Sequence, residues 1–290
     1  MKRVLVIYKK TTLQRYGEND PTIKDLLARQ DPSVAILMEA HEAHLSSLSR
    51  AKEALRALGV KATFRHRHDG GSEAWDLVVT LGGDGTLLWA SHQVDDQTPM
   101  VAINSAPTSS VGYFCAGDGD DVAAILESAL SGKLRGTKLT RMRVEVDGEE
   151  HSGRVLNDIL FCHRVPAATT RYIIHHGDDQ ESHTSSGVWA GPAAGSTAAQ
   201  RSAGGKILPI GSRKIQWVVR EPYRPDDMPL ALSRGLVAPG EDLILKSKTR
   251  NGRMYMDGAQ RVVDVDIGQE IRLSRSSESL TLLGLRSRGR

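Results

Sequence analysis

Short apolar runs separated by a helical pattern characterise the first half of the chain. Four runs predict buried strands, at residues 4–8, 61–66, 77–80 and 100–104. Between the first two, apolar residues recur at helical spacing over residues 34–58, and Gly59 is a natural residue to follow a helix end. A second helix is predicted from Asp120 or Asp121 to Gly132. Strands that alternate with helices favour a parallel sheet with helices on both faces.

From about residue 138 the pattern changes to the two-residue period of strands. Residues 143–146 alternate, Asp147-Gly148 is a turn pair, and residues 154–156 resume the run, which predicts a hairpin. Five later runs also predict strands, at residues 172–175, 216–219, 242–245, 262–265 and 271–273. We therefore expect an α/β domain over residues 1–137 and a mostly β domain over residues 138–274. The polar stretch 11–31 is assigned no element.

Composition narrows the class of protein. The 290 residues carry a net charge of +3 without basic clusters in the body of the chain, and aromatic residues make up only 4%, which argues against a nucleic-acid partner. No apolar stretch is long enough to span a membrane, and the strand pattern at the start leaves no room for a targeting segment. Cys115 and Cys162 match no metal or redox spacing, so a cytoplasmic location is expected.

The loop Gly82-Gly83-Asp84-Gly85-Thr86 is the most informative segment. It lies between a predicted strand and a predicted helix, where glycines and the helix N-terminus bring N–H groups close to an anion. A structural turn would explain the glycines alone. The loop lacks the spacing of a dinucleotide fingerprint and of a P-loop. Because Asp84 would repel phosphate, we expect it to meet a hydroxyl proton or a metal ion carried by the phosphates.

Two further segments are candidates for ligand binding, a polar pair and a run of small residues. Asn157-Asp158 interrupts an apolar strand pattern, which is costly unless a ligand or another residue satisfies both side chains. The small residues 191–199 favour close backbone approach, with Ser196 and Thr197 as hydroxyl donors. A strand end and a flexible linker are the alternatives. The histidine-rich residues 175–183 are interpreted as a solvated hairpin loop and not as a metal site.

Together these segments resemble the NAD kinase family. In that family a Gly-Gly-Asp-Gly-Thr loop, an Asn-Glu pair and a Gly-Ser-Thr-Ala segment occur in this order. Here they stand as the loop around Asp84, as Asn157-Asp158, and as Gly195-Ser196-Thr197-Ala198. The resemblance covers roughly residues 70–275, and several flanking segments are closest in pattern to the plant NADH kinase branch.

The resemblance implies a Rossmann-like α/β N-terminal domain and a β-sandwich-like C-terminal domain, with residues 275–290 returning to the first domain. It also implies a homodimer or homotetramer. Asp158 stands where the family usually has Glu, and Ser186 stands where it has an acidic residue. Because a carboxylate attracts the positive nicotinamide ring of NAD⁺, Ser186 favours acceptance of NADH at least comparable to that of NAD⁺.

The activity that the resemblance implies is phosphoryl transfer from ATP to the adenosine-ribose 2′-hydroxyl of NAD⁺ or NADH, which gives NADP⁺ or NADPH. Asp84 is the expected catalytic residue and accepts the hydroxyl proton, while Mg²⁺ arrives with ATP, so no protein residue is assigned as its ligand. The residues expected to bind the substrates are Gly82, Gly83, Gly85, Thr86, Tyr113, Asn157, Asp158, Ser186, Gly195, Ser196, Thr197 and Ala198. The alternatives are a diacylglycerol-type lipid kinase and a non-catalytic NAD(H)-binding sensor. Another triphosphate or polyphosphate also remains open as the donor.

Overall fold

The chain forms two compact units. The computed structural model describes residues 2–17, 19–67, 74–224 and 229–286. The first unit comprises Met1–Thr137 and Leu280–Arg290, and the second comprises Lys138–Ser279. The two boundaries fall within strands β6 (Gly136–Val146) and β17 (Glu270–Leu283). Of the predicted C-terminal return, residues 287–290 lie outside the described part of the chain.

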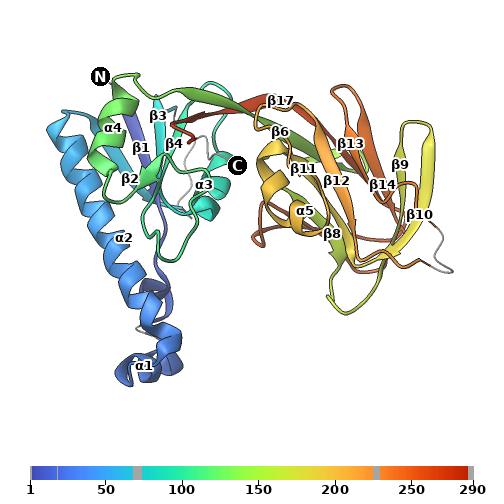
Figure 1. The fold of residues 1–290 in the computed structure, drawn as a ribbon, viewed down its shortest axis with the longest axis horizontal. Helices are drawn as coiled ribbons and strands as arrows, with labels where there is room; N and C mark the ends of the chain where they lie inside the picture. Colours follow the sequence, from blue (N-terminus) through green and yellow to red (C-terminus); the bar gives the residue numbers. More distant parts are fainter. Residues whose placement is uncertain (1, 18, 68–73, 225–228, 287–290) are drawn as a thin grey trace. The chain divides into compact units, whose positions relative to one another are not determined.

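The first unit contains a parallel sheet (Figure 1). Its central strands lie in the order β2 (Lys61–His66), β1 (Arg3–Tyr8), β3 (Leu77–Gly82) and β4 (Met100–Asn104). The short strand β5 (Gly117–Asp118) and the last residues of β17 also pair in parallel with β4. All four strands predicted in this half of the chain are confirmed.

Helices α2 (Pro32–Ala57) and α4 (Val122–Leu130) pack on this sheet. Their apolar residues share one core with every second residue of the strands. That core includes Ala51, Leu55, Ile125 and Leu126 from the helices and Val4, Val6, Val79, Leu81, Val101 and Ile103 from the sheet. Both helices were predicted, α2 from its regular apolar spacing and α4 from the acidic residue at its start. The sequence analysis did not use Asp31, whose carboxylate caps α2 by accepting a hydrogen bond from the N–H of Ser33.

The stretch 11–31, which was assigned no element, contains two short helices. Residues Leu13–Gly17 form one π-helical turn, η1, and Pro21–Ala28 form α1. The Asp20 carboxylate caps α1 by accepting hydrogen bonds from the N–H groups of Thr22 and Ile23. The sequence did contain this start signal, an Asp followed by Pro at the first helical position. Neither helix has a buried residue, which explains why apolar spacing did not reveal them.

The second unit is a β-sandwich, which together with the parallel sheet confirms the predicted fold class. One sheet has the order β10 (Asp179–Ser185), β9 (Thr170–His176), β14 (Asp242–Ser247), β17, β6 and β7 (Glu149–Val155). The other is antiparallel throughout, in the order β13 (Arg234–Val237), β12 (Ile215–Arg220), β11 (Gly187–Pro192), β8 (Ile159–His163), β15 (Gly252–Met256) and β16 (Arg261–Val265). Apolar residues of both sheets form one buried core, which includes Phe161, Tyr172, Trp217, Leu243 and Leu273.

The turns and strand ends of the second unit test three predictions. The hairpin at Asp147-Gly148 is confirmed, with positive φ at both residues as a tight turn requires. The solvated loop expected at residues 175–183 is wrong, because β9 and β10 are joined by a two-residue turn and His183 is buried beside Tyr172. Strand β17 is one strand of 14 residues, whereas the sequence predicted a strand only at residues 271–273 in this region.

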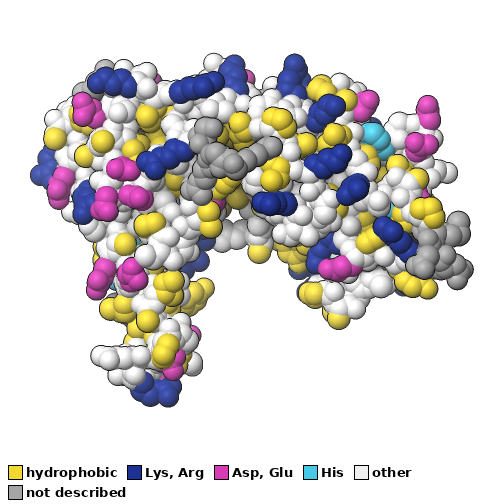
Figure 2. Space-filling model, viewed as in Figure 1, with side chains coloured by type: hydrophobic (Ala, Val, Ile, Leu, Met, Phe, Trp, Pro, Cys, Tyr) yellow, Lys and Arg dark blue, Asp and Glu magenta, His cyan; other side chains and the backbone are white. Residues whose placement is uncertain are grey.

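The surface charge and the helices bear on the possible partners of the chain. On the face shown in Figure 2, Lys and Arg side chains occur over both units, and several follow one another across the second unit. Among the helices that the structure describes, none is long and apolar enough to cross a bilayer.

Candidate functional site

The glycine loop joins β3 to α3 (Asp84–Ser91), with Gly83 as the N-cap residue. A Cβ atom at Gly82 would overlap the Thr86 side chain, and one at Gly83 would overlap Ser110. Gly85 is exposed and has no atom near the position of a Cβ, so this part of the loop is open. Two of the three glycines are therefore required by the protein's own packing, while the third leaves space for a ligand.

The carboxylate of Asp84 is held by two backbone donors. Its two oxygens accept hydrogen bonds from the N–H groups of Tyr113 and Phe114, each at 2.9 Å. Two N–H donors fix the orientation of the carboxylate and leave some of its lone pairs free for a substrate hydroxyl. The sequence did not reveal these donors, since they lie about 30 residues further along the chain.

The segment that supplies these donors is itself fixed against β4. The Asn104 side chain donates to the Ser110 carbonyl at 2.8 Å and accepts from the N–H of Ala106 at 3.3 Å. Gly112 has a φ of +61° and packs directly on Asn104, where a side chain would collide. Tyr113 is half-buried and makes an edge contact with Phe114 at 5.2 Å between ring centroids. The segment thus closes over the glycine loop.

In the second unit, Asp257 shapes the Asn157-Asp158 pair. Its carboxylate accepts hydrogen bonds from three consecutive N–H groups, those of Leu156 at 2.8 Å, Asn157 at 2.6 Å and Asp158 at 3.1 Å. The N–H of Asp257 in turn donates to the Asp158 carbonyl at 2.9 Å. Asp257 adopts a φ of +49°, a left-handed conformation that Asp tolerates better than most residues. We did not single out Asp257 from the sequence, although Asp257-Gly258 is a turn pair.

Asp158 is a buried acid with an unusual proton affinity. Its Oδ2 accepts a hydrogen bond from the Asn157 side chain at 2.8 Å. Burial, and secondly the negative charge of Asp257, raise the pKa of Asp158 to about 7. Near neutral pH this carboxyl group therefore changes charge easily, and a ligand hydroxyl that donates to it would favour the ionised form.

A raised pKa predicts that protein stability depends on pH. Between pH 4 and 7 the folded protein keeps a proton on Asp158 that the unfolded chain has lost, so the free energy of unfolding falls as pH rises through this window. The contribution of this group is about 1 kcal/mol per pH unit. Asp158→Asn should remove it, so that the variant gains about 2 kcal/mol relative to wild type between pH 5 and pH 7. Urea unfolding at four pH values measures this difference.

The exposed loop residue Asp96 provides the control. Asp96→Asn should leave the pH dependence of unfolding as in wild type. A wild-type protein and an Asp158→Asn variant with parallel stability curves would show that Asp158 is already ionised at pH 5.

The small-residue segment packs on the backbone of Asn157. It forms the end of β11, the 3₁₀ turn η2 (Ala193–Thr197) and α5 (Ala199–Ser202). A Cβ atom at Gly191 or Gly195 would overlap the Asn157 carbonyl oxygen. The close approach predicted for this segment therefore occurs within the protein, and it positions the Asn157-Asp158 pair.

The candidate residues of this segment differ in their exposure to solvent, and therefore in whether they can touch a ligand. Ser196 is fully buried, and its hydroxyl donates to the Ala193 carbonyl at 2.7 Å and accepts from the Leu208 N–H at 3.0 Å. This hydroxyl holds the turn and is not free to donate to a ligand. Thr197 is half-buried and Ala198 is exposed, so both can touch a ligand.

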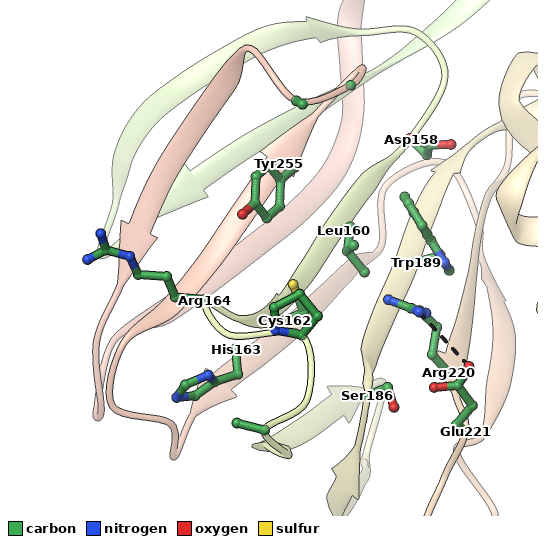
Figure 3. Close-up of a pocket in the computed structure, with 14 residues that line it drawn as sticks. Asp158, Leu160, Cys162, His163, Arg164, Ser186, Trp189, Arg220, Glu221 and Tyr255 are labelled. Carbon is green, nitrogen blue, oxygen red and sulfur yellow. Dashed lines mark ion pairs between the residues drawn. The ribbon is translucent and has the colours of Figure 1, made fainter. Parts of the chain in front are cut away.

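A pocket of about 400 Å³ lies on one face of the antiparallel sheet (Figure 3). Trp189, Leu160 and Tyr255 are in register across β11, β8 and β15 and form its apolar floor. Asp158 and Ser186 line opposite ends of the pocket in Figure 3. Two residues that sequence reasoning placed in one site thus share one pocket.

The side of the pocket at Ser186 carries positive charge. The Arg220 guanidinium lies 5.8 Å from the centre of the Trp189 ring, and the Ser186 N–H donates to the Arg220 carbonyl at 3.1 Å. Glu221 is 4.0 Å from the guanidinium, but its side chain is 70% exposed, so solvent screens this pair. Arg164, a second cation of the lining, lies on the opposite side of the pocket in Figure 3. Neither Trp189 nor Arg220 was predicted to line the site. Arg220 belongs to one of the segments that resemble the plant NADH kinases, but the sequence assigned it no role.

Comparison with known proteins identifies the family. The model described as "ATP-NAD kinase N-terminal domain" matches residues 27–134. A probable NADH kinase of Oryza sativa subsp. japonica is 33% identical over 229 residues, covering 72% of this chain and 70% of that protein. An NADH kinase of Arabidopsis thaliana is 34% identical over 229 residues, covering 71% and 72%. The chain belongs to the NAD kinase family.

Solved NAD kinase structures share the fold. The yeast NADH kinase complexed with NADH has a TM-score of 0.72 at 16% identity, covering 99% of this chain and 84% of that one. An NAD kinase from Archaeoglobus fulgidus in complex with ATP has a TM-score of 0.69 at 19% identity, covering 97% and 92%. The predicted resemblance and fold class are confirmed, and the lipid kinase alternative is set aside.

Proposed function

We propose that this NAD kinase phosphorylates the adenosine-ribose 2′-hydroxyl of NADH at least as well as that of NAD⁺, with ATP as the donor. The identity of 33–34% to two plant NADH kinases over most of the chain is the observation that supports this proposal best. The reaction joins the 2′-oxygen to the γ-phosphorus, breaks the bond to the β-phosphate oxygen, and releases ADP and one proton.

Asp84 is proposed as the catalytic residue. Its carboxylate has a fixed orientation at the start of α3 and is half-buried, so it can align the 2′-hydroxyl and accept its proton. The open backbone at Gly85 and the N-terminus of α3 can hold phosphate groups, and Gly82, Gly83 and Thr86 shape this loop. Tyr113 remains a candidate for stacking on a base.

The second unit is proposed to bind the dinucleotide. Asn157 and Asp158 offer an amide and a buried carboxyl group to ribose hydroxyls. Thr197 and Ala198 would contact the adenine or the amide end. Gly195 and Ser196 act indirectly, since they fix the turn against Asn157.

The pocket explains why NADH would be accepted. A dihydronicotinamide ring is neutral and can lie on the apolar floor formed by Trp189 and Leu160. The oxidised ring is a cation, and it would approach the guanidinium of Arg220 with no acid at Ser186 to compensate. The local field therefore lowers the affinity for NAD⁺ relative to NADH.

Ser186→Asp tests this explanation. The new carboxylate would share the pocket with Arg220 and cancel part of its field, so the ratio of kcat/KM for NADH to that for NAD⁺ should fall about two- to fivefold. Ser186→Asn has the same size without the charge and should leave the ratio at the wild-type value. An unchanged ratio in both variants would remove Ser186 from the account of preference.

Magnesium, the assembly state and the compartment are predictions that accompany this proposal. Mg²⁺ would arrive with the triphosphate. In the described ranges no group of three or more His, Cys, Asp or Glu side chains gathers as a metal site. A homodimer or homotetramer and a cytoplasmic location are expected from the family resemblance and from the composition.

Parallel assays with NAD⁺ and NADH test the function as a whole. Each would be incubated with ATP and Mg²⁺, and NADP⁺ and NADPH would be quantified. Product from both, or mainly from NADH, is the expected result. Product from NAD⁺ alone would reject the proposed preference. Binding of NADH without product under these conditions would favour the sensor alternative.

A further inference from the structure

A basic residue lies beside the glycine loop at the carboxyl edge of the parallel sheet. Tyr8 ends β1, and the next residue is Lys9, whose N–H donates to the Leu81 carbonyl of β3 at 3.4 Å. On the other side, the N–H of Arg67, just beyond β2, donates to the Tyr8 carbonyl at 3.0 Å. By continuation of these registers, Arg67, Lys9 and Gly82 form a row across three adjacent strand ends.

This row lies where the topology of the sheet changes direction. From β1 the chain passes first to β2 on one side and then to β3 on the other. In open α/β sheets, ligands bind outside the carboxyl ends of the strands at such a switch point. Lys9 and Gly82 are the two residues at this point, so Lys9 extends the glycine loop rather than belonging to a separate surface.

The environment of Lys9 is positive. Its side chain is half-buried, and the described residues include no carboxylate paired with its ammonium group. Burial and the charge of Arg67 lower the pKa of Lys9, and the charge of Arg15 acts in the same sense on Arg67. A bound polyanion would offset both the cost of burying these cations and the repulsion between them.

The wall next to Lys9 is a neutral imidazole. His44 of α2 is fully buried, and its Nδ1 shares a hydrogen bond with the Ser105 hydroxyl at 2.7 Å. Burial, and secondly the charge of Lys9, lower the pKa of His44 to about 4. At neutral pH His44 therefore neither compensates the charge of Lys9 nor repels an anion.

We propose that the Lys9 ammonium group binds the triphosphate of the phosphoryl donor next to the glycine loop. This inference rests on the proposed kinase function and extends the phosphate site from Gly85 to the end of β1. Lys9 forms no covalent bond. It offers a point charge to the phosphate oxygens, whose negative charge shifts towards the leaving group during transfer. Lys9 is thus a binding residue for the donor and is not expected to contact NADH.

Lys9→Gln and its exposed neighbour Lys10→Gln form a matched pair of variants. Loss of a charged phosphate contact should raise the KM for ATP of Lys9→Gln about ten- to hundredfold, while the KM for NADH stays within about twofold of wild type. Lys10→Gln should behave as wild type. Lys9→Arg should restore most of the ATP affinity, since it keeps the charge.

Binding of inorganic tripolyphosphate, followed by calorimetry, gives a second readout that needs no catalysis. Wild type should bind it, and Lys9→Gln should bind at least tenfold more weakly. A wild-type protein that transfers no phosphate but shows this difference would reject the proposed function and keep the phosphate site. A kinase whose ATP affinity and tripolyphosphate affinity are unchanged by Lys9→Gln would overturn the inference and keep the function.

Discussion

Asp84→Asn is expected to lower the turnover of NADH by about a hundredfold to ten-thousandfold while its affinity changes little. The size of the effect is that of a general base in proton transfer. The structure adds a reason why Asn is not a neutral replacement. Both oxygens of Asp84 accept backbone N–H groups, and an Asn amide would turn its NH₂ group towards the N–H of Tyr113 or Phe114. The carboxamide would therefore lose both the proton acceptor and one of the bonds that orient it.

Measurements on Asp84→Asn must separate these two losses. Single-turnover transfer reports the chemical step, NADH binding followed by fluorescence reports the affinity, and thermal unfolding reports the integrity of the loop. A melting temperature within a few degrees of wild type together with slow transfer would assign the effect to proton acceptance. Wild-type turnover in Asp84→Asn would exclude Asp84 as the base.

Gly195→Ala is expected to destabilise the second unit strongly. A methyl group at this position would overlap the carbonyl oxygen of Asn157, a backbone atom that cannot rotate away. Overpacking of this kind costs about 3 kcal/mol when the neighbour is rigid. Relief requires a shift of the Asn157-Asp158 backbone, so dinucleotide binding should weaken at least tenfold as well.

Gly211→Ala is the matched control for Gly195→Ala. Gly211 is exposed, and no described atom lies near the position of its Cβ. This variant should be as stable as wild type or more stable by about 0.5 kcal/mol, because Ala restricts the unfolded chain. Chemical unfolding of both variants, with NADH titrations, measures the contrast. Equal stability of the two variants would show that the turn around Gly195 can move.

The elements predicted from the sequence are those with a local cause. The parallel strands are short apolar runs, and α2 and α4 have apolar spacing with an acidic cap, so each could be recognised within a few residues. Strand β10 was missed because its inward positions carry His183 and Ser185, which are polar but buried, so the run shows no apolar alternation. Ser185 can be buried because its hydroxyl shares a hydrogen bond with the Tyr172 hydroxyl at 2.9 Å. This partner lies 13 residues away in the sequence, so only the folded structure reveals it.

The same distinction holds for the candidate site. The glycine loop and the Asn157-Asp158 pair are contiguous and could be predicted. Trp189 and Arg220, which meet by pairing of β11 with β12, could not. Lys9 belongs to no motif in the sequence. Only the order of the strands, which places the end of β1 beside the glycine loop, makes it a candidate binding residue.

The carboxylate of Asp257 has a consequence for how this site comes into being. It fixes the conformation of three residues that precede it by about 100 positions. The pair Asn157-Asp158 therefore cannot adopt its geometry until the chain has been synthesised as far as β15 and that strand has docked beside β8. Binding competence in this unit thus depends on a contact between residues about 100 positions apart, and the two-residue motif would not work if it were transplanted without its distant partner.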